Sequence, residues 1–384
     1  MTLTFLTNIV NHHQLPVADE FYKLLGENYH YIATEPIPEW LVRSGYTANV
    51  DRPYIICTWQ STEKEKYARK LIDESDVVIH GSSKIEWSVK RKKENKVTFH
   101  YEERWNRKSI IRLLSPRRLF NIYRYYFRFR NKRTYLLCAS AFAAKDARLY
   151  GCFPNKCFKW GYFTETNSLE NIKRKSVFES RSDRISMMWC ARFLKLKHPE
   201  LIIMLAKRLK EKGYSFSIDM YGSGKELEKT QMLISKLNLG SIVYLRGNKP
   251  NAEIINEMQR HDIFLFTSDK NEGWGAVVSE AMSNGCVVVT SDVVGSAPYL
   301  IQNGINGMMF HSCNLNSLED VVCGLLDNRE KWSTMSKAAK ERMYKIWSPQ
   351  NAAHNFMELA QYALDDKLSE YSKFDGPASW DING

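Results

Sequence analysis

The chain has 384 residues, of which 44% are hydrophobic and 26% charged, and its formal net charge is +12. This length exceeds one ordinary hydrophobic core and predicts two domains of roughly 150 to 200 residues each. No apolar run approaches the roughly 20 residues of a membrane-spanning helix, and the N-terminus lacks a signal-peptide pattern, so we expect a globular, cytoplasmic protein.

The eight cysteines are scattered and include no Cys-x-x-Cys pair. Several lie within apolar, strand-like runs, which indicates reduced and packed thiols. Cys152 and Cys157 are the closest pair, and no histidine stands nearby, whereas a zinc site needs clustered ligands. We therefore expect no metal site.

Short apolar runs alternate with polar helical stretches from Leu3 to about residue 165, which predicts βαβ units and a parallel sheet. A second, more regular series follows, and the charged stretch 167–183 between the two predicts a linker. We therefore predict an α/β protein with Rossmann-like domains at 1–170 and 171–349. A helix at about 350–366 comes next, and the polar tail 367–384 is expected to be mobile.

The most informative stretch is DIFLFTSDKNEGWGAVVSEAMSNGCVVVTSD, in which a strand ends at Thr267 and a helix starts near Gly275. The loop and the helix start lie at the carboxyl edge of a parallel sheet, where such folds bind ligands and helix amides attract anions. Glu272 precedes the turn and Glu280 lies eight residues later, so they sit at different depths along one ligand.

This arrangement fits a nucleoside diphosphate sugar. Glu272 could accept hydrogen bonds from sugar hydroxyls and Glu280 from ribose hydroxyls. The diphosphate would meet the backbone of Gly273, Trp274, Gly275, Ala276 and Val277. The alternative is a solvated Glu280 and an ordinary helix-start charge at Glu272.

The segment NEGWGAVVSEAMSNGCVVVTSD resembles the signature of retaining glycosyltransferase family 4, the group 1 glycosyltransferases of bacterial polysaccharide and glycan biosynthesis. In that family a turn with a terminal acid follows, but here VGSAPYLI has Tyr299 at that position. The resemblance covers most of 183–350. It implies the GT-B fold, with two Rossmann-like domains facing across a cleft and the C-terminal helix crossing back to the N-terminal domain.

The resemblance also implies residues of the donor site. Arg192 and Lys197 have the family's spacing after the first strand of the second domain, although His198 replaces the usual glycine. Two cations there can neutralise a diphosphate leaving group, although they could also be ordinary surface residues. Gly222 and Arg246 stand in loops that approach the nucleotide in the family. Arg246 could lie against the base, whereas Gly222 could equally be a plain turn residue.

In the first domain the resemblance is weaker. His100, at the end of VTFH, matches the family's functional histidine and is expected to face the cleft, whereas His80 competes for this role. Other residues follow the first strand or the strand of His100 and are expected at the acceptor, namely Asn8, His12, His13, Glu103 and Arg104.

The segment from Arg104 to Arg133 contains eleven Lys or Arg and no acid, interleaved with aromatic residues. It could stack on RNA, lie on anionic lipid or form a solvated face. The resemblance to enzymes that work on lipid carriers favours the membrane over nucleic acid. The expected contacts are Arg117, Arg118, Arg124 and Arg128.

Together these features predict a retaining, metal-independent hexosyltransferase without a cofactor. It would move a sugar from a nucleotide-diphosphate sugar to a hydroxyl of a glycan or lipid-linked glycan in cell-surface polysaccharide biosynthesis, at the inner face of the plasma membrane. A basic nucleic-acid-binding protein, or a sugar-nucleotide epimerase or phosphorylase of the same architecture, is the alternative.

Overall fold

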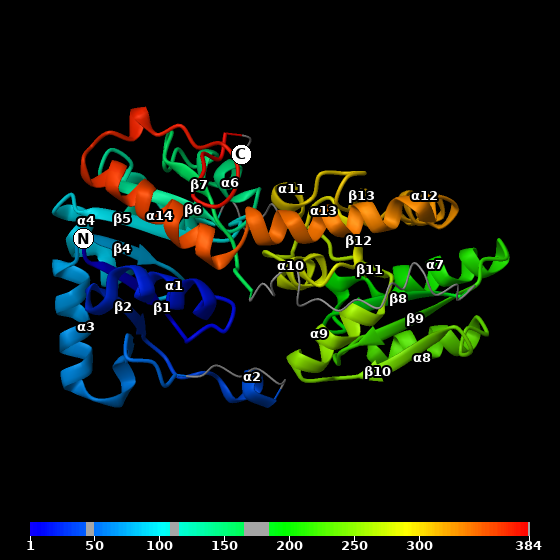
Figure 1. Cartoon of the computed structure of the whole chain (residues 1–384). Coiled ribbons are helices and arrows are strands. Elements are labelled where there is room, and N and C mark those ends of the chain that lie inside the picture. The colour runs from blue at the N-terminus through cyan, green and yellow to red at the C-terminus, as the bar shows by residue number, and fades with distance from the viewer. Residues whose placement is uncertain (44–49, 108–114, 165–183, 383–384) are drawn as a thin grey trace. The chain divides into compact units, whose positions relative to one another are not determined.

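The computed structural model describes residues 1–43, 50–107, 115–164 and 184–382 (Figure 1). The chain forms two compact units: unit 1 comprises Met1–Glu165 and Ile346–Gly384, and unit 2 comprises Thr166–Lys345. The expected linker 167–183, and with it the expected domain boundary, lies outside the described residues.

Unit 1 is built on a parallel sheet of seven strands in the order β3-β2-β1-β4-β5-β6-β7. The strands are β1 (Leu3–Thr7), β2 (Tyr29–Ala33), β3 (Ile55–Cys57), β4 (Val77–His80), β5 (Val97–Glu102), β6 (Thr134–Cys138) and β7 (Cys157–Lys159). The helices between them are α1 (Leu15–Leu25), α2 (Glu39–Arg43), α3 (Thr62–Glu74), α4 (Val89–Lys93), α5 (Pro116–Tyr125) and α6 (Ala143–Arg148). All residues of β1, β4 and β6 are buried, as expected for parallel strands with both faces covered.

The long helix α14 (Pro349–Leu364) belongs to unit 1, although it follows unit 2 in the sequence. Its Phe356 ring lies 5.5 Å from Phe21 of α1 and 5.0 Å from Phe99 of β5. At its end the Arg133 guanidinium donates hydrogen bonds to the carbonyls of Ala363 and Leu364. A cation at this position satisfies terminal carbonyls and complements the helix dipole.

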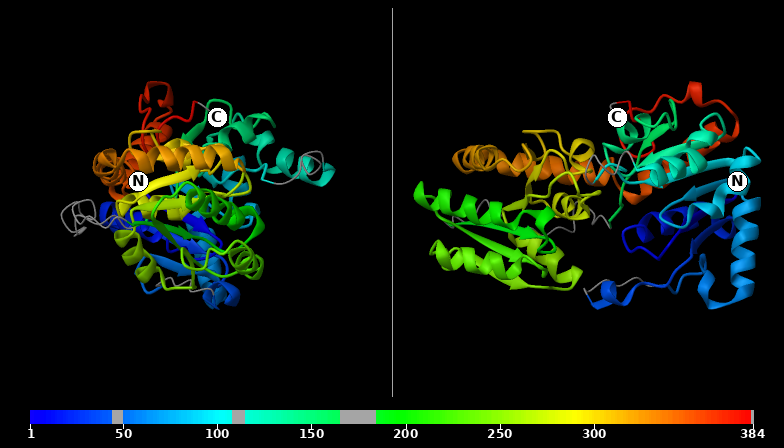
Figure 2. Two further views of the ribbon diagram at one scale, coloured as in Figure 1. Left: turned by 90° about the vertical axis from the view of Figure 1, so that its right-hand side faces the viewer. Right: turned by 180° about the vertical axis from the view of Figure 1, so that it is seen from behind.

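The polar tail does not behave as predicted, because Lys367–Ile382 packs on unit 1. Ala378 and Ser379 are fully buried, and the Trp380 ring lies 4.5 Å from that of Phe158. The tail backbone exchanges hydrogen bonds with Lys159 and covers the outer edge of β7, as the red segment in Figures 1 and 2 shows. The prediction of a mobile tail is wrong because backbone pairing and aromatic packing at an open sheet edge outweigh the polar composition.

Unit 2 has a parallel sheet of six strands in the order β10-β9-β8-β11-β12-β13. The strands are β8 (Ile185–Cys190), β9 (Phe216–Tyr221), β10 (Val243–Gly247), β11 (Ile263–Phe266), β12 (Val287–Ser291) and β13 (Met308–Phe310). The helices are α7 (Pro199–Glu211), α8 (Leu227–Lys236), α9 (Asn251–Arg260), α10 (Ala276–Ser283), α11 (Ala297–Leu300), α12 (Leu315–Asp327) and α13 (Trp332–Lys345).

The strand order of unit 2 reverses between β8 and β11, which are neighbours in the sheet. The chain therefore leaves these two strands in opposite directions, and ligands of such sheets bind in the crevice at the carboxyl ends of the strands. The loop from Arg192 to His198 follows β8, and the loop from Thr267 to Gly275 follows β11. Both contain residues that the sequence predicts for the donor site.

Candidate functional site

The loops after β8 and β11 are fastened to each other by hydrogen bonds. The Thr267 hydroxyl donates to the carbonyl of Lys197 at 2.7 Å and accepts from the buried indole of Trp189 at 3.1 Å. The Asp269 amide donates to the carbonyl of Leu196 at 2.9 Å. The two loops therefore form one surface at the point where the strand order reverses.

Lys197 and Glu272 form an ion pair across these loops. Their side chains are 12% and 14% exposed, and the Lys197 ammonium lies 4.8 Å from the centre of the Phe266 ring. The structure thus brings together two predicted residues that lie 75 positions apart. Arg192, the other predicted cation, is exposed at the end of β8. An anion bound at this pair would meet the Lys197 ammonium beside one carboxylate.

The loop after β9 lies against the backbone of the loop after β8. Gly222 has φ +128° and Gly224 has φ +149°. A Cβ atom would come within 2.1 Å of the Ala191 carbonyl oxygen at Gly222 and within 2.4 Å of the Phe193 carbonyl oxygen at Gly224. Gly222 and Gly224 therefore allow the loop after β9 to lie close to the neighbouring loop, and this contact supports the segment that carries Arg192.

Helix α10 begins at Ala276, directly after the turn. The carbonyls of Gly273 and Trp274 accept hydrogen bonds from the amides of Gly295 and Ser296, both at 3.0 Å. The first amides of an α-helix, here beginning with Ala276 and Val277, have no acceptor inside the helix and favour an anion. The start of α10 therefore lies where the sequence predicts the diphosphate.

The Trp274 side chain belongs to the core of unit 2. It is 1% exposed, its indole donates to Ser279 at 3.2 Å, and its ring lies 6.2 Å from that of Tyr299. Only the backbone of Trp274 can therefore take part in the site. Tyr299, which stands where the related sequences have an acid, is 6% exposed and packs on this indole.

Glu280 is buried in α10 and is only 4% exposed. Burial raises the pKa of its carboxyl to about 7, and a hydrogen bond with Asn251 favours the charged form. Burial and the nearby charge of Glu280 also raise the pKa of Cys190, at the end of β8, to about 12. The interpretation of Glu280 as a solvated surface residue is therefore wrong.

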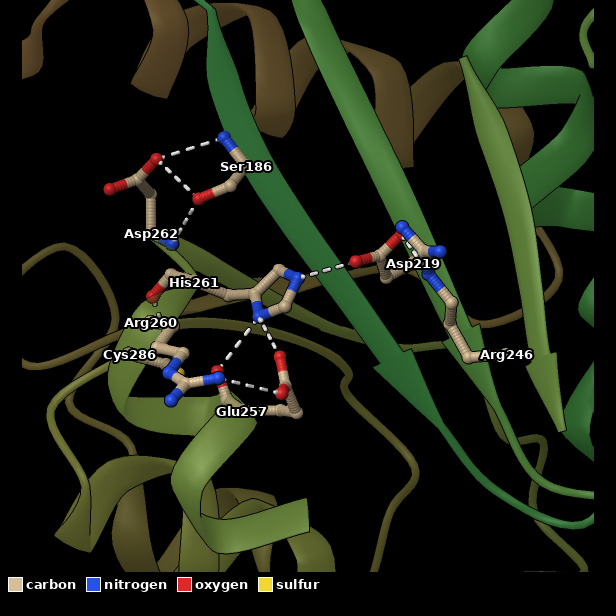
Figure 3. Close-up of polar contacts among 8 residues, drawn as sticks. All are labelled: Ser186, Asp219, Arg246, Glu257, Arg260, His261, Asp262 and Cys286. Atoms are coloured by element: carbon tan, nitrogen blue, oxygen red, sulfur yellow. Dashed lines mark hydrogen bonds and ion pairs between the residues drawn. The ribbon is translucent and has the colours of Figure 1, made fainter. Parts of the chain in front are cut away.

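Arg246 is held by an ion pair with Asp219 on the neighbouring strand (Figure 3). Its guanidinium donates to Asp219 at 2.9 Å and lies 4.8 Å from the centre of the Tyr244 ring. Asp219 also accepts from His261, whose other ring nitrogen lies 2.7 Å from the carbonyl of Glu257. Burial opposes the charge on His261, but its bond to Asp219 holds the pKa above 6.5. The neighbouring strand thus supplies a carboxylate for Arg246, whose side chain is still 47% exposed, and its contact with the base stays a prediction.

Asp262 has a structural role at the opposite end of β11. Its carboxylate accepts hydrogen bonds from the amide and the hydroxyl of Ser186, both at 2.8 Å (Figure 3). This contact ties the beginning of β11 to the beginning of β8. Among the residues that the structure describes, no three His, Cys, Asp or Glu side chains are grouped so that they could hold a metal ion.

His100 and His80 are both fully buried inside unit 1 and stack on each other with their rings 5.3 Å apart. The His100 ring also contacts Tyr126 and Phe153, and its Nε2 lies 3.4 Å from the Lys92 ammonium. Burial, followed by the charge of Lys92, holds the pKa of His100 well below 6.5. The expectation that His100 faces a cleft is therefore wrong, because β4 and β5 place both histidines in the interior of unit 1.

A cavity of about 150 Å³ lies at the carboxyl ends of β4, β5 and β7 in unit 1. Its lining includes Ser82, Tyr101, Glu103, Arg104, Trp105 and Tyr162. The Tyr162 hydroxyl donates to Glu103 at 2.9 Å, and its ring lies 5.8 Å from that of His13. Three residues predicted for the acceptor are therefore close to this cavity: Glu103 and Arg104 line it, and His13 contacts the lining residue Tyr162.

The other predicted acceptor residues lie in the loop after β1. Asn8 is partly buried, and its carbonyl accepts from the Glu35 amide at 2.6 Å. The rings of His12 and His13 lie 3.8 Å apart, and burial, followed by the charge of His12, lowers the pKa of His13 to about 3. Sequence reasoning did not assign Tyr101, Trp105 and Tyr162 to the acceptor, although all three line the cavity. The signal would have been aromatic residues in β5 or in the loops that follow β5 and β7.

The described part of the basic segment is dominated by α5. Leu119, Phe120 and Tyr123 expose 41%, 58% and 58% of their surface. Arg118 instead donates to the carbonyl of Trp105 at 2.8 Å and to Asn106 at 2.9 Å, so it holds α5 to unit 1. Of the four predicted contacts, Arg117, Arg124 and Arg128 are exposed, as are the neighbouring Arg130 and Lys132, while residues 108–114 lie outside the described residues. None of the described helices is long and apolar enough to cross a membrane.

Comparisons with known proteins agree with this architecture. Residues 170–342 match the family described as "Glycosyl transferases group 1". The chain is 30% identical over 151 residues to poly(glycerol-phosphate) alpha-glucosyltransferase of Bacillus subtilis (strain 168), covering 39% of this chain and 21% of the relative. It is 28% identical over 192 residues to the GtfA subunit of the UDP-N-acetylglucosamine–peptide N-acetylglucosaminyltransferase of Streptococcus parasanguinis, covering 49% and 36%. Both matches thus span less than half of the relative's length.

Among solved structures, HepE from Anabaena in complex with UDP has a TM-score of 0.69 at 14% identity and covers 94% of this chain and 100% of its own. Sucrose-phosphate synthase from Thermosynechococcus elongatus has a TM-score of 0.67 at 13% identity and covers 95% and 100%. These likenesses, with the two parallel sheets and their alternating helices, confirm the predicted fold class. The chain has the GT-B fold, and residues 170–342, which make up most of its second unit, are similar to the group 1 glycosyl transferases.

Proposed function

We propose that the protein is a retaining glycosyltransferase whose donor, a nucleotide-diphosphate sugar, binds to unit 2. The observation that carries this proposal is the Lys197–Glu272 pair beside the start of α10, at the reversal of strand order. A diphosphate needs cations and free amides, and a sugar needs carboxylate acceptors. This surface offers all of them. The solved neighbour HepE binds UDP, which makes uridine nucleotides the first donors to test.

In this proposal Arg192, Lys197 and the first amides of α10 hold the diphosphate. Glu272 accepts hydrogen bonds from the sugar, and Glu280 accepts from the ribose. As the acceptor oxygen bonds to the anomeric carbon, the bond to the diphosphate breaks on the same face. The acceptor proton passes to the departing phosphate oxygen. Lys197 and Arg192 stabilise the charge that develops there, which lets the reaction proceed without a metal or another cofactor.

Unit 1 would supply the acceptor site. The cavity lined by Glu103, Arg104 and Tyr162 combines charged groups with aromatic rings, which suits a hydroxyl-rich glycan. Poly(glycerol-phosphate) is named for the Bacillus subtilis relative, and it motivates a role in cell-surface polysaccharide biosynthesis with a glycan or lipid-linked glycan acceptor. His100 is left out of the reaction because it is fully buried.

The exposed face of α5 supports an additional membrane contact. Arg117 and Arg124 lie beside the exposed Phe120 and Tyr123, a combination in which aromatic rings reach headgroup depth while cations meet lipid phosphates. We therefore place the enzyme at the inner face of the plasma membrane, on anionic lipid and not on nucleic acid.

A thermal-shift screen of nucleotide sugars tests the donor assignment. A true donor raises the melting temperature of the protein by mass action, by an amount that grows with its concentration. We expect a shift with at least one nucleotide-diphosphate sugar and none with the free sugar. If no nucleotide sugar changes the melting temperature, the donor assignment is refuted.

A further inference from the structure

His198 stands between Lys197 and the first residue of α7, with a backbone conformation that side chains rarely adopt. Its φ is +48° and its ψ is +53°, in the left-handed region. For a residue with a Cβ atom this conformation costs roughly 1 to 2 kcal/mol, so a glycine would be more stable there unless the side chain makes compensating contacts.

The His198 ring makes such contacts on both sides. Its Nδ1 lies 2.6 Å from a carboxylate oxygen of Glu200, and its Nε2 lies 3.3 Å from one of Asp269. The side chain is 17% exposed. A ring with both nitrogens protonated can donate to both carboxylates, whereas a neutral ring can donate to only one.

Asp269 connects this ring to the turn that carries Glu272. Its other carboxylate oxygen accepts from the Asn271 amide at 2.8 Å, and its carbonyl accepts from the Glu272 amide at 3.0 Å. His198 is also bonded covalently to Lys197. One side chain therefore touches both loops of the ion pair: it follows the lysine directly, and it holds the aspartate that shapes the turn of the glutamate.

We propose that His198 is a positioning residue, and that its doubly protonated ring clamps the two loops so that Lys197 and Glu272 stay paired at the reacting end of the donor. The effect on catalysis rests on the proposed function, whereas the clamp itself does not. Loss of the second ring proton would break one of the two ring contacts and leave the pair less ordered, while the bonds from the Thr267 hydroxyl and the Asp269 amide still join the loops. The site would then be sensitive to pH through a residue that does not touch the substrate.

The surroundings of the ring favour the charged form. The hydrogen bond with Glu200 is the largest influence and raises the pKa of His198 above 6.5, against the effect of burial, and Asp269 acts in the same direction. The other facing groups are the Cys313 thiol, 3.5 Å from Nε2, and Lys195, whose charge acts on Glu200. Because the pKa is raised, the clamp is complete below pH 6.5 and is lost as the pH rises through the pKa of the folded protein.

The test compares three variants with the wild type across pH 6 to 9. His198→Gly removes the ring and suits the left-handed backbone, and His198→Gln keeps a polar side chain without a charge. His354→Gln changes an exposed histidine of unit 1 and serves as the control. Transfer is measured with the donor found in the screen, as kcat and donor KM, together with the melting temperature of each variant.

We expect the wild-type kcat to fall by roughly tenfold as the pH rises through the His198 pKa, because the pair acts at the reacting bond. Both His198 variants should already have the low kcat at pH 6.5 and should lack this step, while donor KM changes less. His198→Gly should melt no lower than the wild type, and His354→Gln should behave like it. A His198→Gln enzyme with the wild-type kcat and pH profile would overturn the proposal.

A second measurement needs no turnover. NMR titration of the wild type should give a His198 pKa above 6.5 that falls in Asp269→Asn, and hydrogen exchange at Asn271 and Glu272 should accelerate as the ring loses its second proton. A His198 pKa of 6.5 or lower, or exchange that does not respond to it, overturns the clamp. If the clamp is found but no nucleotide sugar binds, only the proposed function fails.

Discussion

Replacing Glu280 by glutamine should make the protein more stable at high pH and weaken its binding of nucleotide. The carboxyl of Glu280 is 4% exposed, and burial raises its pKa from 4.5 to about 7. At about 1.4 kcal/mol for each pKa unit, this corresponds to roughly 3 kcal/mol of unfavourable free energy when the carboxyl is ionised. Glutamine keeps the shape of the side chain and a hydrogen-bonding group for Asn251 without the charge.

The sign follows from the two protonation states. Between pH 4.5 and about 7 the folded protein holds the Glu280 proton more tightly than the unfolded chain, so its stability falls as the pH rises through this range. Glu280→Gln should remove this loss. Its advantage over the wild type should be small below pH 4.5 and should level off above pH 7, at up to roughly 10 °C in melting temperature for a unit of this size.

The assay is calorimetric unfolding of both proteins at pH 5 and pH 8, followed by titration with UDP. Glu319→Gln is the control, and its effect on stability should have the opposite sign. Arg208 and Lys212 lower the pKa of Glu319, so removing this carboxylate should destabilise unit 2 at pH 8. UDP affinity should fall roughly tenfold or more in Glu280→Gln, as the ribose loses a charged acceptor. A melting difference that does not depend on pH refutes the burial argument, and unchanged UDP affinity refutes the ribose assignment.

Three further predictions concern the reaction and the membrane. Lys197→Ala and Glu272→Ala should each lower kcat by roughly 100-fold or more without unfolding the protein, and wild-type turnover in either variant would contradict the assigned roles. EDTA should leave transfer unchanged, whereas a loss that manganese or magnesium restores would show that a metal is needed. The protein should bind anionic vesicles at low salt, and glutamine at Arg117, Arg124 and Arg128 should release it, unlike glutamine at Lys229, Lys236 and Lys337. Tighter binding to single-stranded RNA than to lipid would favour a nucleic-acid partner.

The fold could be predicted because parallel strands leave a strong signal. Strands buried on both faces are continuous apolar runs, so the segments of β8, β11 and β12 stand out between amphipathic helices. The three-residue strand β7 and the tail that covers it leave no such signal. Their stability comes from backbone pairing between Lys159 and Ser379, which are 220 positions apart and have no local pattern in common.

The candidate site could be predicted in part, where spacing alone fixes a residue's place in the fold. Lys197 and Glu272 each follow a strand at a short distance, so the topology of the sheet brings them together. The roles expected for Arg246 and His100 depended on what surrounds the side chain. Asp219 on the neighbouring strand forms an ion pair with Arg246, and His80 of β4 and Tyr126, directly after α5, pack on His100. Such contacts between distant segments are not visible in a motif.

Gly224 and His198 both have positive φ, but the space around the two positions differs, so a side chain fits at one and not at the other. At Gly224, φ is +149° and a Cβ atom would lie 2.4 Å from the Phe193 carbonyl oxygen, so backbone would have to move. At His198 the side chain has room and two carboxylate partners. Gly224→Ala should therefore displace the loop after β8 and with it Arg192, at a cost of roughly 3 kcal/mol or more.

The control for this prediction is Gly213→Ala. Gly213 has φ +81°, and a Cβ atom added there would meet nothing within 4 Å, so the substitution should cost only the roughly 1 kcal/mol of the strained backbone. Urea unfolding and UDP titration of both variants separate the two effects. Gly224→Ala should lose stability and UDP affinity together, because one contact supports both. If it unfolds no more easily than Gly213→Ala and binds UDP like the wild type, the loop after β9 does not support the donor site.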